Sequence, residues 1–375
     1  MAGACPLNRF AALQHVTVTN RGHTLALPLK PPQMPYLSIE NLSVSYDGNR
    51  VLDRVSLDVE RGEMIALLGS SGCGKTTLLR SIAGFVLPDE GSIKVAGEDI
   101  THLPPEKRAT AMMFQSYALW PHMTVAGNIG YGLRMRGWKR DAIEQRVADM
   151  LKLLQLEGFA KRPVTQLSGG QRQRVAMGRA LAVDPQMLLL DEPMSNLDYK
   201  VRLELRHELR ALQRRIGITA VYVTHDREEA LMLADRIAVI DAGRVVQFGP
   251  PEDVFHRPGS AFVAGFMGAD NALPMVRLPD GSLMLSRDAG GEPVTAHFRS
   301  DAARVGPAGG EAGVRELRFE GSIAQAVYVG QGYRYRVRVI DGADVWALAD
   351  TRIDEGTPVT VAVPRDALLV FATRS

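Results

Sequence analysis

A short apolar run followed by a glycine-rich loop is the feature that most constrains the fold of this chain. Residues 64–68 read Met-Ile-Ala-Leu-Leu, and residues 69–76 read Gly-Ser-Ser-Gly-Cys-Gly-Lys-Thr. The second segment matches the phosphate-binding pattern G-x-x-x-x-G-K-[ST] in full, and a predicted helix over 76–83 follows it. The sequence therefore predicts a strand, a loop and a helix that together hold the phosphates of a nucleotide.

The residue types of this loop suit phosphate chemistry. Its glycines let the backbone curl so that N–H groups point at phosphate oxygens, and the helix adds the positive end of its dipole. Lys75 neutralises the charge of the β- and γ-phosphates, while the hydroxyl of Thr76 can bind Mg²⁺. Cys73 is interpreted as a filler without a catalytic role. The predicted nucleotide-binding residues are Gly69, Ser70, Ser71, Gly72, Cys73, Gly74, Lys75, Thr76 and Thr77.

A second buried strand over residues 187–190 ends in two acidic residues, Asp191 and Glu192. An acid at the carboxyl end of a strand beside a phosphate loop can coordinate Mg²⁺, and Asp191 fits that role. Glu192 would then face the γ-phosphate and could orient or deprotonate the attacking water. The alternative is an ordinary helix N-cap after a strand, but the phosphate loop favours the metal role.

Strands and helices alternate over the first two thirds of the chain. Residues 106–164 are predicted to be helical, and Asp141 could cap a helix over 141–156. This alternation implies a mostly parallel sheet covered by helices. The other predicted helices lie at 200–215 and after the loop that begins the segment 167–183, and the predicted strands lie at 37–46, 51–59, 64–68, 187–190, 219–223 and 237–240.

After about residue 250 the pattern changes to short strands separated by turns. Period-two alternation is clearest in residues 333–339, where the arginines fall on one face and the apolar residues on the other. The segment 302–313 is rich in Gly and Ala and is expected to be a flexible loop. We predict a small all-β module with strands at 322–328, 333–340, 345–349 and 359–363.

Composition limits which partners and which cellular compartment fit this chain. The 375 residues include 44 basic and 42 acidic side chains, so the net charge of +2 gives no electrostatic case for nucleic acid as a partner. No apolar run approaches the roughly 18 residues needed to cross a bilayer. Only Cys5 and Cys73 are present, which rules out a disulfide framework and fits a cytosolic protein. Residues 1–35 contain no acid, and we interpret them as a disordered extension or as a start assigned upstream of Met34.

The segment Leu167-Ser-Gly-Gly-Gln171 lies just before a long predicted helix and forms a second anion-binding helix N-terminus. One phosphate loop already holds the nucleotide, so this second site needs its own explanation. Here the sequence resembles the ATP-binding cassette (ABC) family, whose signature is LSGGQ. In that family two cassettes pair head to tail, and each signature closes on the nucleotide of the other. The resemblance implies nucleotide contacts from Ser168, Gly169, Gly170 and Gln171.

The resemblance extends to other motifs in order along the chain. Tyr46 matches the aromatic residue that stacks on adenine, although a buried strand tyrosine is the alternative. Gln115 matches the Q-loop glutamine, which touches Mg²⁺ and the water and links the site to the helical subdomain. Asp198 matches the D-loop aspartate, and His225 matches the switch histidine at the γ-phosphate. Two departures lie outside the catalytic positions: Asn196 stands where Ala is more usual, and Arg227 stands where Gln is common.

What the family implies is an α/β fold: a P-loop NTPase cassette with a mixed sheet and a helical subdomain, then a small all-β domain of the OB type. The expected ATPase domain covers residues 36–268, with the helical subdomain at about 106–182. The transport-associated (TOBE) domain covers 269–375. The implied reaction is hydrolysis of ATP with Mg²⁺ in a sandwich dimer, where Glu192 activates water and Lys75 and His225 contact the phosphates.

Other classes of cassette protein fit less well. An exporter would carry a fused membrane domain, a translation-type protein two cassettes, and a repair ATPase a long coiled coil. Residues 245–258, 262–266 and 362–370 resemble the accessory domain of bacterial importer ATPases and its link. The segment 114–125 looks like the surface that receives a permease, with a locally packed aromatic cluster as the alternative. The implied partners are a second copy of the chain, two transmembrane permease subunits and, indirectly, a periplasmic solute-binding protein, at the cytoplasmic face of the inner membrane.

The transported solute is less constrained than the reaction. Residues 99–105, 114–119 and 132–136 look most like those of spermidine/putrescine importer ATPases. Importers of iron(III), of a phosphonate such as 2-aminoethylphosphonate, and of sugar phosphates share much of this pattern and remain alternatives. A different class of role, in which the C-terminal module senses a small ligand and regulates the chain, could coexist with transport.

Overall fold

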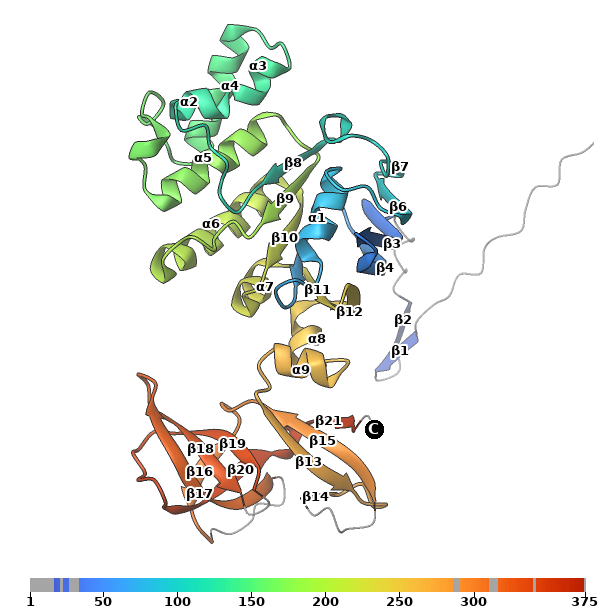
Figure 1. Cartoon of the computed structure of the whole chain (residues 1–375), viewed down its shortest axis with the longest axis vertical. Coiled ribbons are helices and arrows are strands. Elements are labelled where there is room, and N and C mark those ends of the chain that lie inside the picture. Colours follow the sequence, from blue (N-terminus) through green and yellow to red (C-terminus); the bar gives the residue numbers. More distant parts are fainter. Residues whose placement is uncertain are drawn as a thin grey trace, which may run out of the picture.

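The computed structural model describes residues 34–285, 291–309, 316–339 and 342–373, together with two short strands, β1 (Thr17–Asn20) and β2 (His23–Ala26). These two strands pair antiparallel. The interpretation of residues 1–35 as a disordered or misassigned extension falls largely outside the described residues. Figure 1 shows a larger α/β part followed by a smaller part made of strands.

A six-stranded sheet forms the centre of the larger part. Its strands are arranged in the order β12-β11-β5-β10-β9-β8, and all pair in parallel except β12, which is antiparallel to β11. Strands β5, β9 and β10 are buried along their whole length, which explains their continuous apolar sequences. The strands are β5 (Met64–Leu68), β8 (Thr110–Met113), β9 (Met187–Asp191), β10 (Thr219–Thr224), β11 (Arg236–Asp241) and β12 (Arg244–Gly249).

The two faces of this sheet bury different layers, because successive strand residues point to opposite sides. On one face, Ile65 and Leu67 share a core with Leu78 of α1 (Lys75–Ala83). A four-stranded antiparallel sheet in the order β4-β3-β6-β7 completes that core. Its strands are β3 (Leu37–Tyr46), β4 (Asn49–Val59), β6 (Glu90–Val95) and β7 (Glu98–Asp99).

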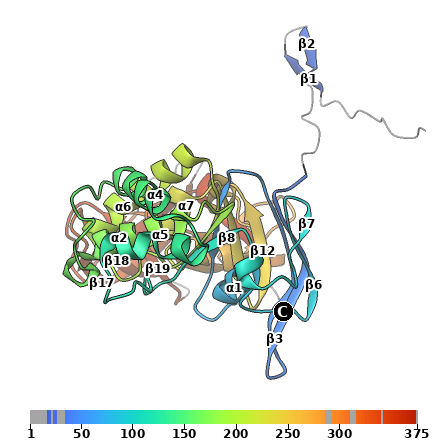
Figure 2. The ribbon, with the colours of Figure 1, turned by 90° about the horizontal axis from the view of Figure 1, so that it is seen from above.

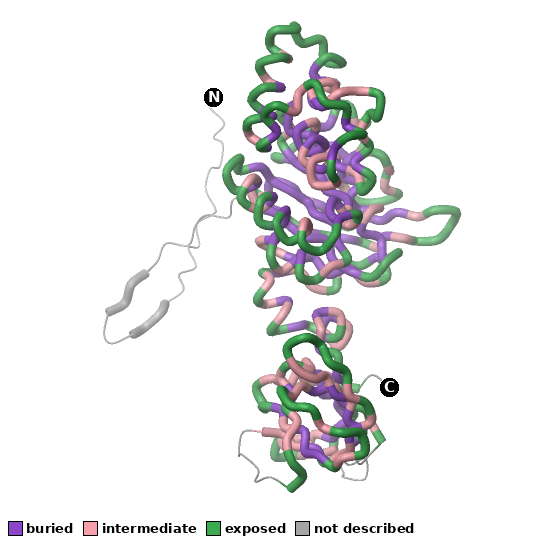
Figure 3. Tube along the Cα trace, turned by 90° about the vertical axis from the view of Figure 1, so that its left-hand side faces the viewer, coloured by how far each residue is buried: buried purple, intermediate pink, exposed green. Residues whose placement is uncertain are grey.

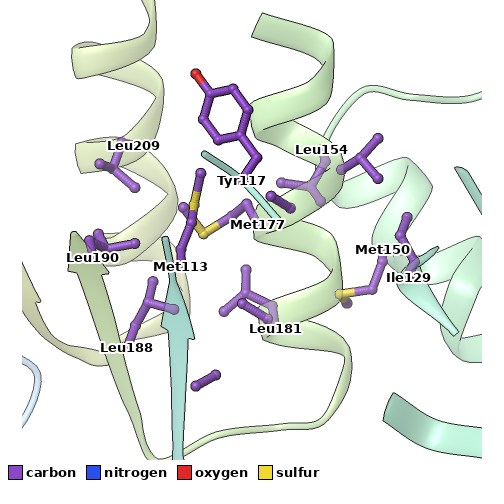
Figure 4. Close-up of a cluster of buried hydrophobic side chains, with 14 of the residues drawn as sticks. Met113, Tyr117, Ile129, Met150, Leu154, Met177, Leu181, Leu188, Leu190 and Leu209 are labelled. Atoms are coloured by element: carbon purple, nitrogen blue, oxygen red, sulfur yellow. The ribbon is translucent and has the colours of Figure 1, made fainter. Parts of the chain in front are cut away.

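Helices cover the other face. Leu188 and Leu190 of β9 pack there against Met177 and Leu181 of α5 and against Leu209 of α6, as Figure 4 shows. Figure 3 shows the buried positions gathered along the central sheet. The helices of the larger part, besides α1, are α2 (Val125–Ile129), α3 (Tyr131–Met135), α4 (Arg140–Leu153), α5 (Gly169–Ala182), α6 (Tyr199–Ile216) and α7 (Arg227–Leu233), with 3-10 turns at η1 (Pro105–Lys107) and η2 (Val164–Gln166).

Two local predictions in the helical region are wrong. The expected helical character of residues 106–164 fails at Thr110–Met113, which form strand β8 and pair in parallel with β9. Four residues carry too little periodicity to separate a buried edge strand from a helical turn. Asp141 does not cap its helix: α4 begins at Arg140 after the N-cap residue Lys139, which makes no side-chain cap. Asp141 lies instead in the first turn, where its charge complements the helix dipole.

Two short helices, α8 (Pro251–His256) and α9 (Ala261–Phe266), lead into the C-terminal strands. Five of these strands close a barrel in the order β16-β19-β18-β17-β20, and four form a sheet in the order β14-β13-β15-β21. The all-β prediction is confirmed. The strands are β13 (Asn271–Arg277), β14 (Leu283–Met284), β15 (Glu292–Phe298), β16 (Arg304–Pro307), β17 (Glu316–Tyr328), β18 (Tyr333–Val339), β19 (Asp344–Ala349), β20 (Pro358–Pro364) and β21 (Leu369–Ala372), with a 3-10 turn at η3 (Arg365–Ala367).

The expectation of a flexible loop over residues 302–313 is wrong for Arg304–Pro307. These residues are strand β16, which pairs antiparallel with β20 and closes the barrel. Residues 310–313 lie outside the described residues. The segment is rich in Gly and Ala, and β16 buries little side-chain surface, so its sequence carries no strand pattern. Only the pairing of its backbone with β20 defines it as a strand. Among the described residues, no helix is long and apolar enough to cross a membrane.

Candidate functional site

The carboxyl ends of three neighbouring parallel strands bring the candidate site together. In the sheet register, Leu68 of β5 lies beside Thr224 of β10, and Val223 of β10 lies beside Asp191 of β9. The phosphate loop follows β5, Glu192 follows β9 and His225 follows β10. Open parallel sheets bind ligands at this edge, because the loops after the strands converge there.

The phosphate loop is wound tightly around the ammonium group of Lys75. The Lys75 Nζ atom donates hydrogen bonds to the carbonyl oxygens of Gly69 (2.8 Å) and Ser70 (2.7 Å), and the side chain is buried. Gly74 has a φ of +106°, and a Cβ there would lie 2.7 Å from Leu52 Cδ2. Only glycine satisfies both conditions. Cys73 is buried with its Sγ atom 3.8 Å from Lys75 Nζ.

Thr76 and Asp191 meet across the mouth of this loop. The Thr76 hydroxyl donates to Asp191 Oδ1 at 3.1 Å, and the Asp191 side chain is buried. Burial raises the pKa of the Asp191 carboxyl above its ordinary value, and the hydrogen bond from Thr76 offsets only part of this. Neighbouring hydroxyl and carboxylate oxygens of this kind are ligands that Mg²⁺ prefers.

Glu192 is held between two side chains from other segments. Its Oε2 atom accepts a hydrogen bond from Gln115 Nε2 at 3.4 Å, and its Oε1 atom lies 3.2 Å from His225 Nδ1. The Glu192 backbone has a φ of +43°, in the left-handed region that non-glycine residues adopt less often than glycine. Its N–H donates to the carbonyl of Val223 at 3.1 Å, which fixes that geometry. The three predicted catalytic residues therefore lie together.

The segment that begins α5 lies elsewhere. Ser168 and Gln171 form a reciprocal capping box: Gln171 N donates to Ser168 Oγ (3.3 Å), and Ser168 N donates to Gln171 Oε1 (3.0 Å). Figures 1 and 2 both show α5 apart from α1. No hydrogen bond joins residues 168–171 to the phosphate loop within the described part of the chain. One copy of the chain thus presents two separate helix N-termini, that of α1 after the phosphate loop and that of α5 after Ser168.

Comparison with known proteins identifies the family. The family model "ABC transporter" matches residues 52–195, and the "TOBE domain" model matches residues 299–371. The chain is 46% identical over 347 residues to "Spermidine/putrescine import ATP-binding protein PotA 1" of Pseudomonas aeruginosa, covering 88% of this chain and 91% of the relative. The chain belongs to the ABC transporter family. It is an ATP-binding subunit of the import type, and such subunits are ATPases coupled to transport.

Other relatives of this ABC protein differ in the solute they are named for. "Fe(3+) ions import ATP-binding protein FbpC" of Brucella melitensis is 39% identical over 350 residues, covering 90% of this chain and 96% of that protein. A solved structure titled as cbiO1 from Clostridium perfringens, part of the ABC transporter complex cbiONQ, superposes with a TM-score of 0.56 at 30% identity. It covers 60% of this chain and 92% of that one. The α/β cassette and the C-terminal OB-type barrel are therefore both established.

Two further predicted contact residues of the ABC cassette lie at the end of β3 and at the start of α6. Tyr46 ends β3 and is 45% exposed, so the alternative of a buried strand tyrosine is wrong. Asp198 caps α6 by accepting a hydrogen bond from Val201 N at 3.0 Å. Asp198 stands two positions after Asn196, whose side chain donates to the carbonyl of Gln115 at 3.0 Å. Asn196, which stands where Ala is more usual in the family, therefore holds the backbone of the Q-loop.

An ion cluster around the buried Arg206 was not predicted from the sequence. Arg206 of α6 is 1% exposed, and it reaches Asp226 (2.7 Å), Glu229 (3.6 Å) and Glu228 (3.4 Å). Asp226 caps α7 directly after His225 and so fixes where the histidine leaves β10. The only available signal was the row of arginines at 202, 206 and 210 on one helix, a pattern that usually marks a solvated face.

Proposed function

We propose that this chain hydrolyses ATP with Mg²⁺ as a homodimer beneath two permease subunits, and that the transported solute is a polyamine such as spermidine or putrescine. The observation that carries the reaction is the convergence of Gln115, Glu192 and His225 beside the pair Thr76 and Asp191. A water-orienting carboxylate and a metal-binding pair, both next to a phosphate loop, suit hydrolysis of a phosphoanhydride.

Mg²⁺ fits the residues present. Thr76 and Asp191 would hold it, with Gln115 as a further oxygen ligand when ATP is bound. The described residues contain no group of three acidic, His or Cys side chains that could hold a metal by themselves. This agrees with Mg²⁺ that is bound by one or two protein groups, phosphate oxygens and water. When bound, the ion would neutralise the charge on the β- and γ-phosphates.

Each remaining residue has a proposed role in this reaction. Lys75 and the backbone N–H groups of the loop bind the phosphates, with Thr77 beside them. Tyr46 is exposed and free to stack on an adenine ring. Glu192 orients the attacking water. His225 contacts both the γ-phosphate and the Glu192 carboxylate and so sets their relative positions.

A second copy of the chain explains the signature segment. Ser168 and the N–H groups of Gly169, Gly170 and Gln171 form an anion-binding helix end that lies apart from the phosphate loop of the same chain. In a head-to-tail dimer this end would close on the partner's γ-phosphate, with Asp198 across the same interface. Binding of ATP would then close the dimer, and hydrolysis would open it.

A permease is proposed to dock on residues 114–125 at the cytoplasmic face of the inner membrane. Trp120 is 40% exposed, and its ring centroid lies 5.3 Å from that of Tyr131 and 6.2 Å from that of His122. Phe114 packs on the exposed Phe85 at 6.1 Å. These rings pack on one another and still present apolar surface, which suits an interface with a partner helix. A periplasmic solute-binding protein would act through the permease subunits.

The proposed domain division keeps an ATPase domain at 36–268 and a TOBE domain at 269–375. The helical subdomain lies within 106–182, where strand β8 belongs to the central sheet. The match of the TOBE model to residues 299–371 lies within the second of these ranges.

Uptake assays test the solute. A strain that lacks this gene should lose import of labelled putrescine or spermidine and recover it with the intact gene but not with a Glu192→Gln copy. Iron(III), 2-aminoethylphosphonate and sugar phosphates serve as the competing labels. Polyamine is supported by the relatives named for spermidine and putrescine at 44% and 46% identity. If the strain instead lost only the uptake of iron(III), the transported solute would be iron(III), as in the name of the 39% identical relative, and not a polyamine.

A further inference from the structure

The turn between α3 and α4 is exposed along its whole length. Residues 134–140 read Arg-Met-Arg-Gly-Trp-Lys-Arg, and every one of them is exposed. Two of them are large apolar side chains, Met135 at 71% and Trp138 at 44% exposure. Figure 1 shows α3 and α4 at the end of the larger part that lies away from the C-terminal strands. We call residues 134–140 the basic turn.

The backbone of the basic turn is held by its own hydrogen bonds. Trp138 N donates to the carbonyl of Leu133 at 3.1 Å, and Gly137 N donates to that of Arg134 at 2.9 Å. These two bonds, together with a φ of +72° at Gly137, form the Schellman motif that often ends a helix. A folded turn therefore presents the apolar side chains to the outside.

Two of the four cations of the basic turn donate hydrogen bonds to uncharged groups. Arg134 Nη2 donates to the carbonyl of Gly127 at 2.7 Å, and Arg136 Nη1 donates to the carbonyl of Val183 at 2.9 Å. A carbonyl oxygen orients a guanidinium but does not cancel its charge. Because both side chains are exposed, their charge can still attract an anion outside the chain.

The acidic residues near the basic turn do not balance its charge. Only Arg140 has an acidic partner, with its Nε atom 2.8 Å from Glu144 Oε1. Lys139 and the two arginines that bind carbonyls form no ion pair with any residue that the structure describes. Residues 131–140 contain no acid, and Asp141 is the first acid after them. The turn therefore carries a surplus of positive charge.

The basic turn adjoins the segment 114–125, on which a permease is proposed to dock. The ring centroid of Trp120 lies 5.3 Å from that of Tyr131, the first residue of α3. Arg134 Cζ lies 5.9 Å from the centroid of the same Tyr131 ring. A continuous row of side chains thus leads from the proposed docking segment to the turn, and a permease seated on that segment would bring the turn close to the bilayer.

We propose that the basic turn binds directly to the anionic lipid headgroups of the membrane surface. Trp138 and Met135 would enter the headgroup region, where tryptophan is the preferred aromatic residue. Arg136 and Lys139 would lie at the lipid phosphates, since basic side chains near an anionic surface each strengthen binding. The placement of the turn beside the bilayer in the cell rests on the proposed function, whereas its binding to lipid does not.

Vesicle flotation of the full chain tests the proposal without nucleotide or permease. One set of vesicles contains phosphatidylethanolamine and phosphatidylglycerol at a ratio of about 3:1, and the other contains phosphatidylcholine alone. We expect the chain to float with the anionic vesicles at low ionic strength and to be released as salt screens the charges. Absence of flotation, or equal flotation with both kinds of vesicle, would overturn the proposal.

Three variants locate the contact with the anionic vesicles. The double variant Arg136→Gln with Lys139→Gln should bind about 25-fold more weakly, at about fivefold for each cation removed. Trp138→Ser should also weaken binding, because it removes the aromatic anchor. Lys152→Gln with Arg214→Gln is the matched control, since both residues are exposed and the loss of charge is the same. Unweakened binding by the first two variants would overturn the proposal, because the contact would then lie elsewhere on the chain.

Two further measurements separate the proposal from its alternatives. Hydrogen exchange of the chain with permease subunits in lipid-free detergent should leave residues 134–140 unprotected. Protection there would assign the basic turn to a protein contact and would overturn the lipid assignment. The ATPase rate of the Arg136→Gln, Lys139→Gln variant should equal that of the unaltered chain. A chain that floats with anionic vesicles but hydrolyses no ATP would contradict the proposed function and support the lipid contact.

Discussion

The imidazole of His225 lies 3.2 Å from the carboxylate of Glu192, although 33 positions separate them in the chain. The two residues follow β10 and β9, neighbouring strands in parallel register, so their approach is set by the sheet. The other oxygen of the same carboxylate accepts from Gln115. Glu192 is thereby held in place before any nucleotide arrives, which is the preorganisation that general-base chemistry requires.

The first prediction concerns this carboxylate. Glu192→Gln should keep the shape of the side chain but lose its ability to accept a proton from water. We expect ATP to bind with ordinary affinity, hydrolysis to fall by about 10²–10⁴-fold, and the chain to accumulate as a dimer with ATP. ATPase assays and size-exclusion chromatography measure the two effects. Glu228→Gln, at an exposed position on α7, is the matched control, and near-normal turnover in Glu192→Gln would disprove the assignment.

The second prediction separates binding from hydrolysis. Lys75 provides the buried ammonium group of the phosphate loop, and its Nζ atom rests on two loop carbonyls. Lys75→Ala should therefore weaken ATP binding itself by roughly tenfold to a hundredfold, since hydrogen bonds to charged groups contribute that much. Equilibrium titration with a fluorescent ATP analogue measures it. Lys94→Ala, on strand β6, is the control and should bind ATP as tightly as the unaltered chain. If Lys75→Ala also kept its affinity for ATP, Lys75 would have no part in binding the phosphates.

Most of the site could be predicted because its residues lie in short motifs tied to strand ends. The loop at 69–76 and the acids at 191–192 each follow a buried apolar run, so sequence order alone places them at one edge of a parallel sheet. The short strands β8 and β16 could not be predicted in this way. Each has four residues, and only the pairing of its backbone with a distant partner defines it as a strand.

Contacts between side chains of distant segments could not be predicted from the sequence either. The contact of Arg206 with Asp226 joins residues 20 apart and depends on how α6 and α7 pack. The side-chain oxygen of Gln173 is buried without a hydrogen-bond partner, and this too is visible only once α5 is placed against α6. Local patterns in a sequence encode elements and motifs, whereas such contacts depend on tertiary packing.

The third prediction concerns stability. Arg206 is buried and pairs with three carboxylates, of which Glu229 is buried and Asp226 is partly buried. Arg206→Ala would leave Asp226 and Glu229 with only the more distant Arg202, at 3.7 and 4.0 Å. We expect the free energy of unfolding to fall by about 3 kcal/mol, the lower end for a broken buried ion pair, because Arg202 remains. Urea denaturation followed by circular dichroism measures this change. Arg140→Ala removes an exposed ion pair with Glu144 and should change stability little; an equally small effect of Arg206→Ala would mean that the cluster is solvated.

The last prediction follows from the raised pKa of Asp191. A carboxyl whose pKa is higher in the folded chain than in the unfolded one favours folding below the unfolded value, and this contribution is lost as the pH rises through the folded value. Without nucleotide at neutral pH, burial of the Asp191 charge therefore opposes folding, and Asp191→Asn should raise the melting temperature. The difference should shrink as the pH falls toward the ordinary pKa range of aspartate, because a carboxyl with a raised pKa takes up its proton before an ordinary one does.

Adding ATP with Mg²⁺ should reverse this order, because the wild-type carboxylate then has a cation to bind and the amide does not. Thermal unfolding at several pH values, with and without MgATP, measures both effects. Asp53→Asn is the contrasting variant: hydrogen bonding to Arg244 lowers the pKa of Asp53, so its removal should destabilise the chain at neutral pH. If Asp191→Asn gained the same stabilisation from MgATP as the wild type, Asp191 would have no part in holding the metal, and the case for Thr76 as its neighbour in that role would fail with it.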